Sequence, residues 1–130
     1  MKVASRSRKG QGLIEAACAA MFLIPIAMGM LDVTVLVTAN MSNDTAAKNC
    51  ARAAANQNDQ SQAKQAAQKV INGVKTSTII TSMVLDTIDY PASKEAVTVT
   101  TKMDVRFPVP FPGYEHQVFV ARAVEPILAQ

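Results

Sequence analysis

The sequence contains no tryptophan, one histidine and few other aromatic residues. Proteins that hold single-stranded nucleic acid stack bases on aromatic side chains, but only 5% of the residues here are aromatic. His116 has no set of cysteines or carboxylates at ligand spacing, so the sequence predicts no metal site. No Ser-His-Asp or Cys-His arrangement and no phosphate-binding glycine loop can be assembled. We therefore expect no enzyme activity and no cofactor.

Cysteine is also scarce, since the chain has only Cys18 and Cys50. If one helix joins them, they lie about 48 Å apart at a rise of 1.5 Å per residue. A disulfide needs Cα atoms within about 7 Å, so no intramolecular bridge is expected. We expect Cys18 to be a small apolar packing residue. Cys50 is either a free thiol or the site of an intermolecular bridge.

Charge is nearly absent from residues 12–39, which contain only Glu15 and Asp32. Residues 1–10, by contrast, carry four basic side chains and no acid. Without those ten residues the chain keeps nine of its thirteen basic residues and all ten acids, so its formal charge falls from +3 to −1. Because no basic stripe remains outside this leader, the sequence indicates no nucleic-acid partner.

Residues 16–31 are apolar around the whole circumference of a helix, which excludes a water-exposed amphipathic helix. A helix from Gly12 to Val37 is about 39 Å long, enough to cross a bilayer core of about 30 Å. The basic residues before it predict a cytoplasmic N-terminus, with the rest of the chain carried across the membrane. An ordinary cleaved secretory signal is the alternative. Its apolar run would be unusually long, and Thr38-Ala39-Asn40 is a poor cleavage site.

Two residues within the apolar helix need an explanation. A carboxylate such as Glu15 costs about 2.5–3.5 kcal/mol in a membrane helix, so it indicates a function unless it lies in headgroup water. Pro25 removes one helical hydrogen bond and costs about 3 kcal/mol in water, although membrane helices tolerate it better. Pro25 marks either a kink, which we favour, or a point where the helix melts during assembly.

The order of these features resembles that of a type IV prepilin. The chain reads Gly10-Gln11-Gly12-Leu13-Ile14-Glu15-Ala16, then an apolar run with Pro25, Gly29 and Asp32, then an alanine-rich tract over residues 46–55. Over about residues 8–55 this is similar to the TadE-like family of tight-adherence (Tad, Flp-type) pilus proteins. Ala16 and Ala17 depart from the family pattern, which has a bulkier pair after the glutamate.

The resemblance implies how the chain is processed and assembled. A prepilin peptidase in the membrane would cleave after Gly10, leaving Gln11 as the first residue. Glu15 would then meet the α-amine of a neighbouring subunit, a pairing that removes two isolated charges from a low-dielectric environment. The implied partners are the lipid bilayer, other pilin subunits, the peptidase and the inner-membrane pilus assembly platform.

The chain is longer than the major subunits of such pili. The resemblance therefore implies a minor pilin or pseudopilin that takes part in assembly of the pilus (fimbrium) and in cell adhesion. It would be located in the bacterial inner membrane, in the extracellular pilus, or in both. The alternative function is an uncleaved, single-pass envelope protein that binds another envelope component.

The chain divides into a leader (1–10), a transmembrane or filament-core helix (11–39), a helical segment (40–75) and a small antiparallel sheet domain (76–130). Asn43 or Asp44 is expected to cap a second helical stretch. A further helix over residues 60–72, ending at Gly73, has a thin apolar face that suits packing on a small sheet.

The predicted fold class is α+β, with a three-stranded antiparallel sheet. Strands are expected at residues 76–85, 97–107 and 117–124, and near-strict alternation in the second indicates a half-buried strand. Residues 108–113 are expected to form a loop, because three prolines cannot donate hydrogen bonds to a sheet. The aromatic residues Phe107, Phe111 and Tyr114 beside this loop either cap the sheet edge, which we favour, or contact a partner.

Overall fold

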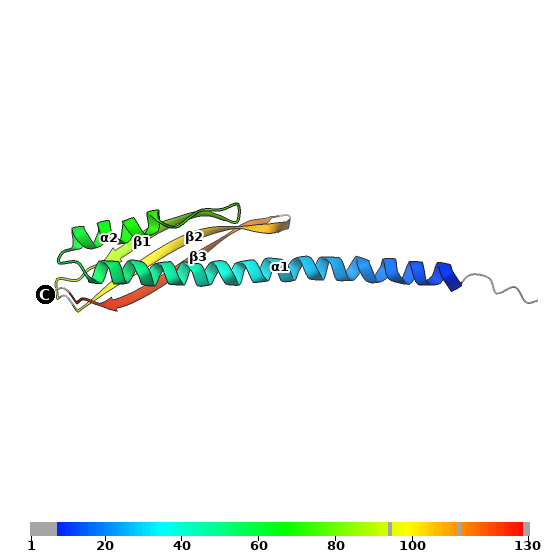
Figure 1. Ribbon diagram of the computed structural model, residues 1–130, viewed down its shortest axis with the longest axis horizontal. Coiled ribbons are helices and arrows are strands. Elements are labelled where there is room, and N and C mark those ends of the chain that lie inside the picture. The colour runs from blue at the N-terminus through cyan, green and yellow to red at the C-terminus, as the bar shows by residue number, and fades with distance from the viewer. Residues whose placement is uncertain (1–7, 94, 112, 129–130) are drawn as a thin grey trace, which may run out of the picture.

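The computed structural model describes residues 8–93, 95–111 and 113–128. It contains two helices and three strands: α1 (Arg8–Ala55), α2 (Gln60–Asn72), β1 (Ile80–Asp89), β2 (Ala96–Phe111) and β3 (Tyr114–Pro126). The strands form one antiparallel sheet in the order β1-β2-β3. The predicted α+β class is confirmed. Figure 1 shows that α2 and the sheet lie along only one half of α1, while the other half extends alone.

The first helix is continuous over 48 residues. The expectation that Asn43 or Asp44 caps a second helical stretch is therefore wrong, since both lie inside α1. Asn43 is fully buried, and its side chain bonds to the sheet instead of to a helix terminus. Pro25 does not interrupt α1 either. Because proline lacks an N–H, the carbonyl of Met21 loses its donor within the helix.

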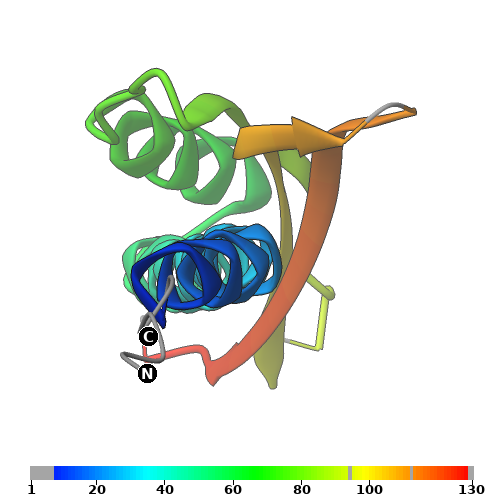
Figure 2. The same cartoon turned by 90° about the vertical axis from the view of Figure 1, so that its right-hand side faces the viewer.

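The second helix begins and ends where the sequence predicts. Asp59 caps it by accepting a hydrogen bond from the N–H of Gln62 at 2.8 Å. Its buried residues are Ala63, Ala67 and Ile71. These pack mainly against α1 rather than against the sheet, because small side chains on both helices permit close approach. Figure 2 shows both helices on the same side of the sheet.

The middle strand supplies most of the sheet's buried face. The alternation predicted for it is confirmed: Val97, Val99, Thr101, Met103 and Val105 are all buried. Met83 of β1 and Phe119 of β3 lie directly beside Met103 in the register, on the face that contacts α1. The first strand is shifted, since β1 covers Ile80–Asp89 instead of the predicted residues 76–85. The third is longer than predicted, since β3 covers Tyr114–Pro126 instead of residues 117–124.

The loop predicted for residues 108–113 is wrong over residues 108–111, because β2 continues to Phe111. The pairing of β2 with β3 passes from Arg106 and His116 directly to Phe111 and Tyr114. Residues 107–110 therefore bulge out of the ladder, where the prolines need not donate to a neighbouring strand. The N–H of Val109 donates to Asp32 of α1 instead, at 3.1 Å. Gly113, with φ of +88°, provides the turn into β3.

A buried amide joins α1 to the two C-terminal strands. The Nδ2 of Asn43 donates to the carbonyl of Phe119 at 3.1 Å, and its Oδ1 accepts from the hydroxyl of Thr101 at 2.8 Å. Asn43 and Thr101 are both fully buried. The Thr101 hydroxyl therefore loses access to water on folding and depends on this amide for a hydrogen bond.

Replacing this amide should weaken the contact between helix and sheet. We expect Asn43→Ala to lower the free energy of unfolding by about 1–3 kcal/mol, because it leaves buried polar groups unsatisfied. Asn40→Ala is the matched control, since Asn40 is exposed on the same helix, and it should change stability by less than about 0.5 kcal/mol. Denaturant unfolding of the full chain in detergent micelles measures both. Equal stability of the two variants would contradict this role for Asn43.

Candidate functional site

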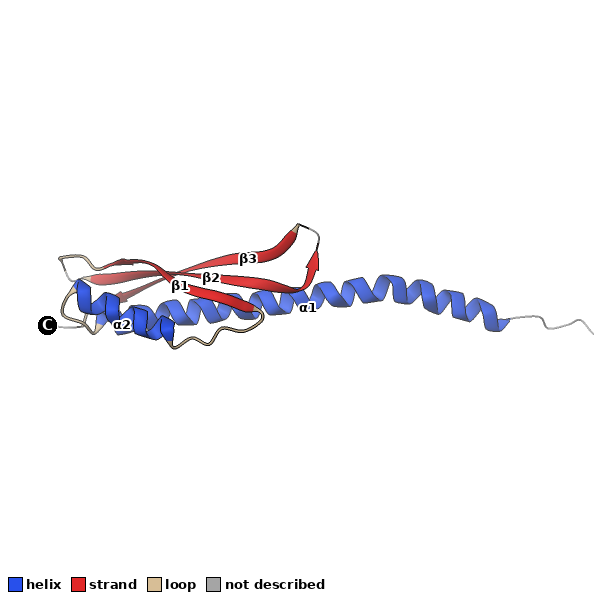
Figure 3. Cartoon of the chain, turned by 90° about the horizontal axis from the view of Figure 1, so that it is seen from above, coloured by secondary structure: helices blue, strands red, loops and turns tan. Residues whose placement is uncertain are grey.

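Residues 10–31 of α1 form the bare half of the helix, which the rest of the chain does not cover. Their apolar side chains are exposed, for example Leu13 at 75%, Met21 at 74% and Met30 at 68%. Figure 3 shows this half as a continuous, gently curved helix extending past the sheet. Among the described residues, α1 is the one helix long and apolar enough to cross a membrane. The bare half is thus compatible with a membrane anchor.

The length of the bare half also fits that environment. From Gly10 to Leu31 the helix rises about 32 Å, close to the roughly 30 Å of a bilayer core. Water-exposed helices bury an apolar stripe and keep a polar one, whereas this segment is exposed and apolar on all sides. Lipid or other apolar helices would satisfy such a surface, and water would not.

Asp32 marks the end of the bare half. Its side chain is only 4% exposed, and its Oδ1 accepts the hydrogen bond from the Val109 N–H. Its Oδ2 is buried without a hydrogen-bond partner among the described residues. The sequence indicated an acid after the apolar run but not its role. Nothing in the sequence predicted a contact with a proline-rich segment 77 residues away.

The predicted cleavage and assembly residues lie at the opposite end of the bare half. Gly10, Gln11, Ile14 and Glu15 line a shallow depression on one face of the first turns of α1. In the described part of the chain, Glu15 has no hydrogen-bond or ion-pair partner. A Cβ atom at Gly10 would meet nothing within 4 Å. The leader residues 1–7 lie outside the described residues.

The expectation for Cys18 is wrong, whereas Cys50 is a free thiol, one of the two alternatives that the sequence left open. Cys18 is exposed on the bare half, so within the chain it is not a packing residue. Cys50 is fully buried against α2, and its thiol donates to the carbonyl of Ala67 at 3.6 Å. Burial raises the pKa of the Cys50 thiol to about 11. The folded chain therefore gives a second protein no access to Cys50 for a disulfide.

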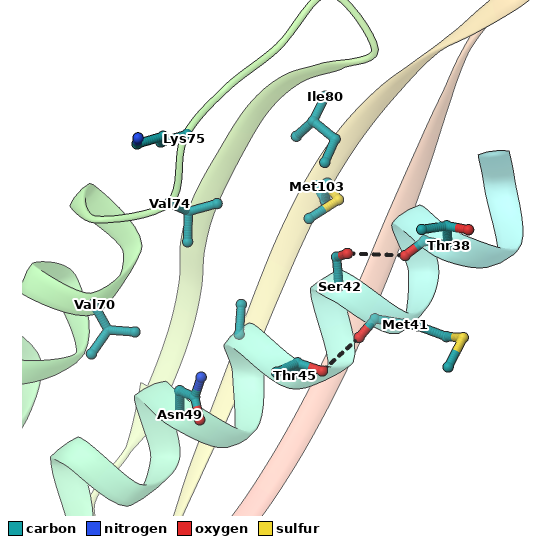
Figure 4. Close-up of a pocket in the computed structure, with 11 residues that line it drawn as sticks. Thr38, Met41, Ser42, Thr45, Asn49, Val70, Val74, Lys75, Ile80 and Met103 are labelled. Carbon is teal, nitrogen blue, oxygen red and sulfur yellow. Dashed lines mark hydrogen bonds between the residues drawn. The ribbon is translucent and has the colours of Figure 1, made fainter.

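A groove of about 530 Å³ lies between α1, the end of α2 and the start of β1 (Figure 4). Two hydroxyls along it bond back to the helix, Ser42 to the carbonyl of Thr38 and Thr45 to that of Met41. Lys75 is the one charged residue in its lining. Such a lining offers no acid and base pair for proton transfer.

The sole histidine lies on the outer face of the sheet. The Nδ1 of His116 is 3.4 Å from an Asp104 carboxylate oxygen, and both side chains are partly exposed. An exposed pair of this kind contributes little to stability. Within the described residues, no group of three or more His, Cys, Asp or Glu gathers where it would hold a metal ion.

Comparisons with protein-family models, with curated proteins and with solved structures found no match for this chain.

Loss of the Asp32 carboxylate should loosen the end of the β2–β3 hairpin. A hydrogen bond contributes roughly 1 kcal/mol net, so we expect Asp32→Ala to speed amide exchange at Val109 roughly fivefold. Asp32→Asn keeps an acceptor oxygen and should leave the exchange nearly unchanged. Hydrogen exchange followed by NMR in micelles measures both variants. Unaltered exchange at Val109 in Asp32→Ala would show that this contact does not hold the hairpin.

Proposed function

We propose that the chain is a minor pilin or pseudopilin of a Tad/Flp-like type IV pilus, processed after Gly10 and incorporated through its bare helix. The observation that carries this proposal is the combination of the bare apolar half of α1 with Glu15 near its start. The folded part of the chain leaves this half uncovered. A subunit that passes from a membrane to a filament requires such a helix in both places.

Glu15 supports assembly in particular. It is the one side chain within residues 10–31 that is charged at neutral pH, and the chain itself offers it no partner among the described residues. Cleavage after Gly10 would create an α-amine at Gln11, one helical turn from Glu15 in sequence. The amine of one subunit and the carboxylate of its neighbour would neutralise each other inside a bundle of apolar helices.

The proposed topology places residues 40–130 outside the cytoplasmic membrane and the leader inside. Four basic residues before the apolar helix favour this orientation. The sheet and α2 would then be presented on the outer side, where a subunit of a pilus takes part in adhesion. The proposed partners are other pilin subunits, the prepilin peptidase and the inner-membrane assembly platform.

Blocking the proposed cleavage should leave the fold intact. We expect Gly10→Ala to accumulate as the uncut precursor in the membrane, whereas the wild-type protein begins at Gln11. A Cβ atom added at Gly10 or at Gly12 would meet nothing within 4 Å, so Gly12→Ala is a matched control that should still be cut. Intact mass and N-terminal sequencing of protein from cells measure the outcome. A wild-type N-terminus at Met1, or beyond residue 35, would contradict processing at Gly10.

The same measurement separates this proposal from the alternative of an uncleaved, single-pass envelope protein. That alternative requires the same membrane helix but predicts that wild-type protein keeps its leader. A mature protein beginning after about Ala39 would instead indicate an ordinary secretory signal.

Removal of the Glu15 carboxylate should block assembly without affecting processing. We expect Glu15→Ala to be inserted and cut normally but to give few or no sheared pili. Without the carboxylate, the α-amine of the neighbouring subunit would be buried as an unpaired ion, at a penalty of several kcal/mol. Glu15→Asp should be partly defective, since the charge persists on a shorter side chain. Glu95→Ala, an exposed glutamate of the outer domain, is the control. Wild-type pilus yield and subunit co-purification in Glu15→Ala would end this assignment.

A further inference from the structure

The β2–β3 hairpin ends beside α1 at the boundary of the bare half. We call its described residues 107–111 and 113–114 the hairpin tip. The hydrogen bond from the Val109 N–H to Asp32 fixes the tip at the level where the apolar segment ends. Figures 1 and 3 both show the hairpin extending along α1 to this level and no farther. If the bare half spans a bilayer, the tip lies at the outer membrane surface.

The composition of the tip suits that position. In the sequence, no side chain from Phe107 to Tyr114 is charged at neutral pH, whereas Arg106 and Glu115 flank the segment. Tyr114 is 70% exposed, so it covers no core residue and does not cap the sheet edge. Tyrosine is enriched where membranes meet water, because its ring is apolar and its hydroxyl remains hydrated.

Three successive positions of the tip, residues 108–110, offer no free backbone donor. Pro108 and Pro110 have no N–H, and the N–H of Val109 is bonded to Asp32. An unsatisfied N–H becomes costly where water is scarce. Residues 108–110 thus expose the apolar rings of two prolines but no N–H group that needs water.

We infer that the hairpin tip seats in the headgroup layer of the bilayer that α1 spans, with Tyr114 as its interfacial anchor. This inference rests on the proposed membrane span of α1. The partner is the phospholipid surface of the outer leaflet. Together, the bare half and the tip give the subunit two points of attachment, which fix its depth and its rotation about α1 before assembly. Leaving the membrane requires both points to be released.

The absence of tryptophan from the chain makes fluorescence a direct test. Three single-tryptophan variants of the full chain are reconstituted in phosphatidylcholine and phosphatidylglycerol vesicles. For Tyr114→Trp and Val124→Trp, the vesicles contain, or lack, lipids brominated on the acyl carbons nearest the headgroup. For Phe22→Trp, which would lie near the bilayer midplane, the bromines are on carbons near the end of the acyl chain. Tyr114→Trp reports on the tip, and Phe22→Trp reports on the bare half. Val124→Trp is the control, because Val124 is exposed on the same strand about 34 Å away at 3.4 Å per residue.

We expect the Tyr114→Trp emission to be shifted to the blue and quenched by the brominated lipids. The Val124→Trp emission should resemble that of tryptophan in water and remain unquenched. Quenching of Phe22→Trp without quenching of Tyr114→Trp would overturn the tip contact and leave the membrane span intact. Equal quenching of Tyr114→Trp and Val124→Trp would overturn a contact specific to the tip. An unquenched Phe22→Trp would overturn the span and the tip contact together.

Discussion

The packing of the sheet against one half of α1 decides what the other half can do. The contact depends on small side chains along α1, which let the sheet approach from one side and α2 from another. These residues are Ala39, Ala46, Ala47, Cys50, Ala51 and Ala54. Larger side chains of the sheet, such as Met103 and Val105, fill the space beside these small residues of α1. Small residues such as Ala16, Ala17 and Ala20 also occur in the bare half, but neither the sheet nor α2 covers them, so the helix extends alone there.

Two buried polar side chains fix where along α1 this packing occurs. Apolar contacts are not directional and would tolerate a slip of the sheet along the helix. Asn43 opposes such a slip, because its amide must meet both Thr101 and Phe119. Asn43 acts near the middle of β2, and Asp32 does the same near the end of β2 through Val109. The two are separated by eleven positions, or about 16 Å of helix, so they set the axial position of the hairpin at two points.

Local patterns predicted the elements that depend on local physics. The apolar helix, the boundaries of α2 and the alternation of β2 follow from periodicity and capping, and the structure contains each of them. The membrane and pilus roles of Glu15 and Gly10 remain predictions.

The errors occur where a distant partner changes the role of a residue. Asn43 favours a helix cap on its own, but hydrogen bonds to residues 58 and 76 positions away hold it inside α1. The prolines of β2 are tolerated because the bulge frees them from donating. The role of Asp32 also depends on a distant partner, since Val109 lies 77 positions away. No local pattern in the sequence contains such pairings.

The bare half has one further property that bears on assembly. Its apolar surface accepts lipid tails and apolar helices equally well, because both are apolar. It therefore stabilises the helix in a membrane and in a bundle of helices, but gives little preference between the two. Under the proposed function, directed transfer from membrane to filament must then depend on groups that distinguish the two. Glu15 is such a group, because a neighbour's amine is available only where subunits meet. The hairpin tip would be another, with the opposite preference, because its inferred contact with headgroups would exist only in the membrane. Under these proposals, assembly exchanges one contact for the other, and the helix between them need not change its fold.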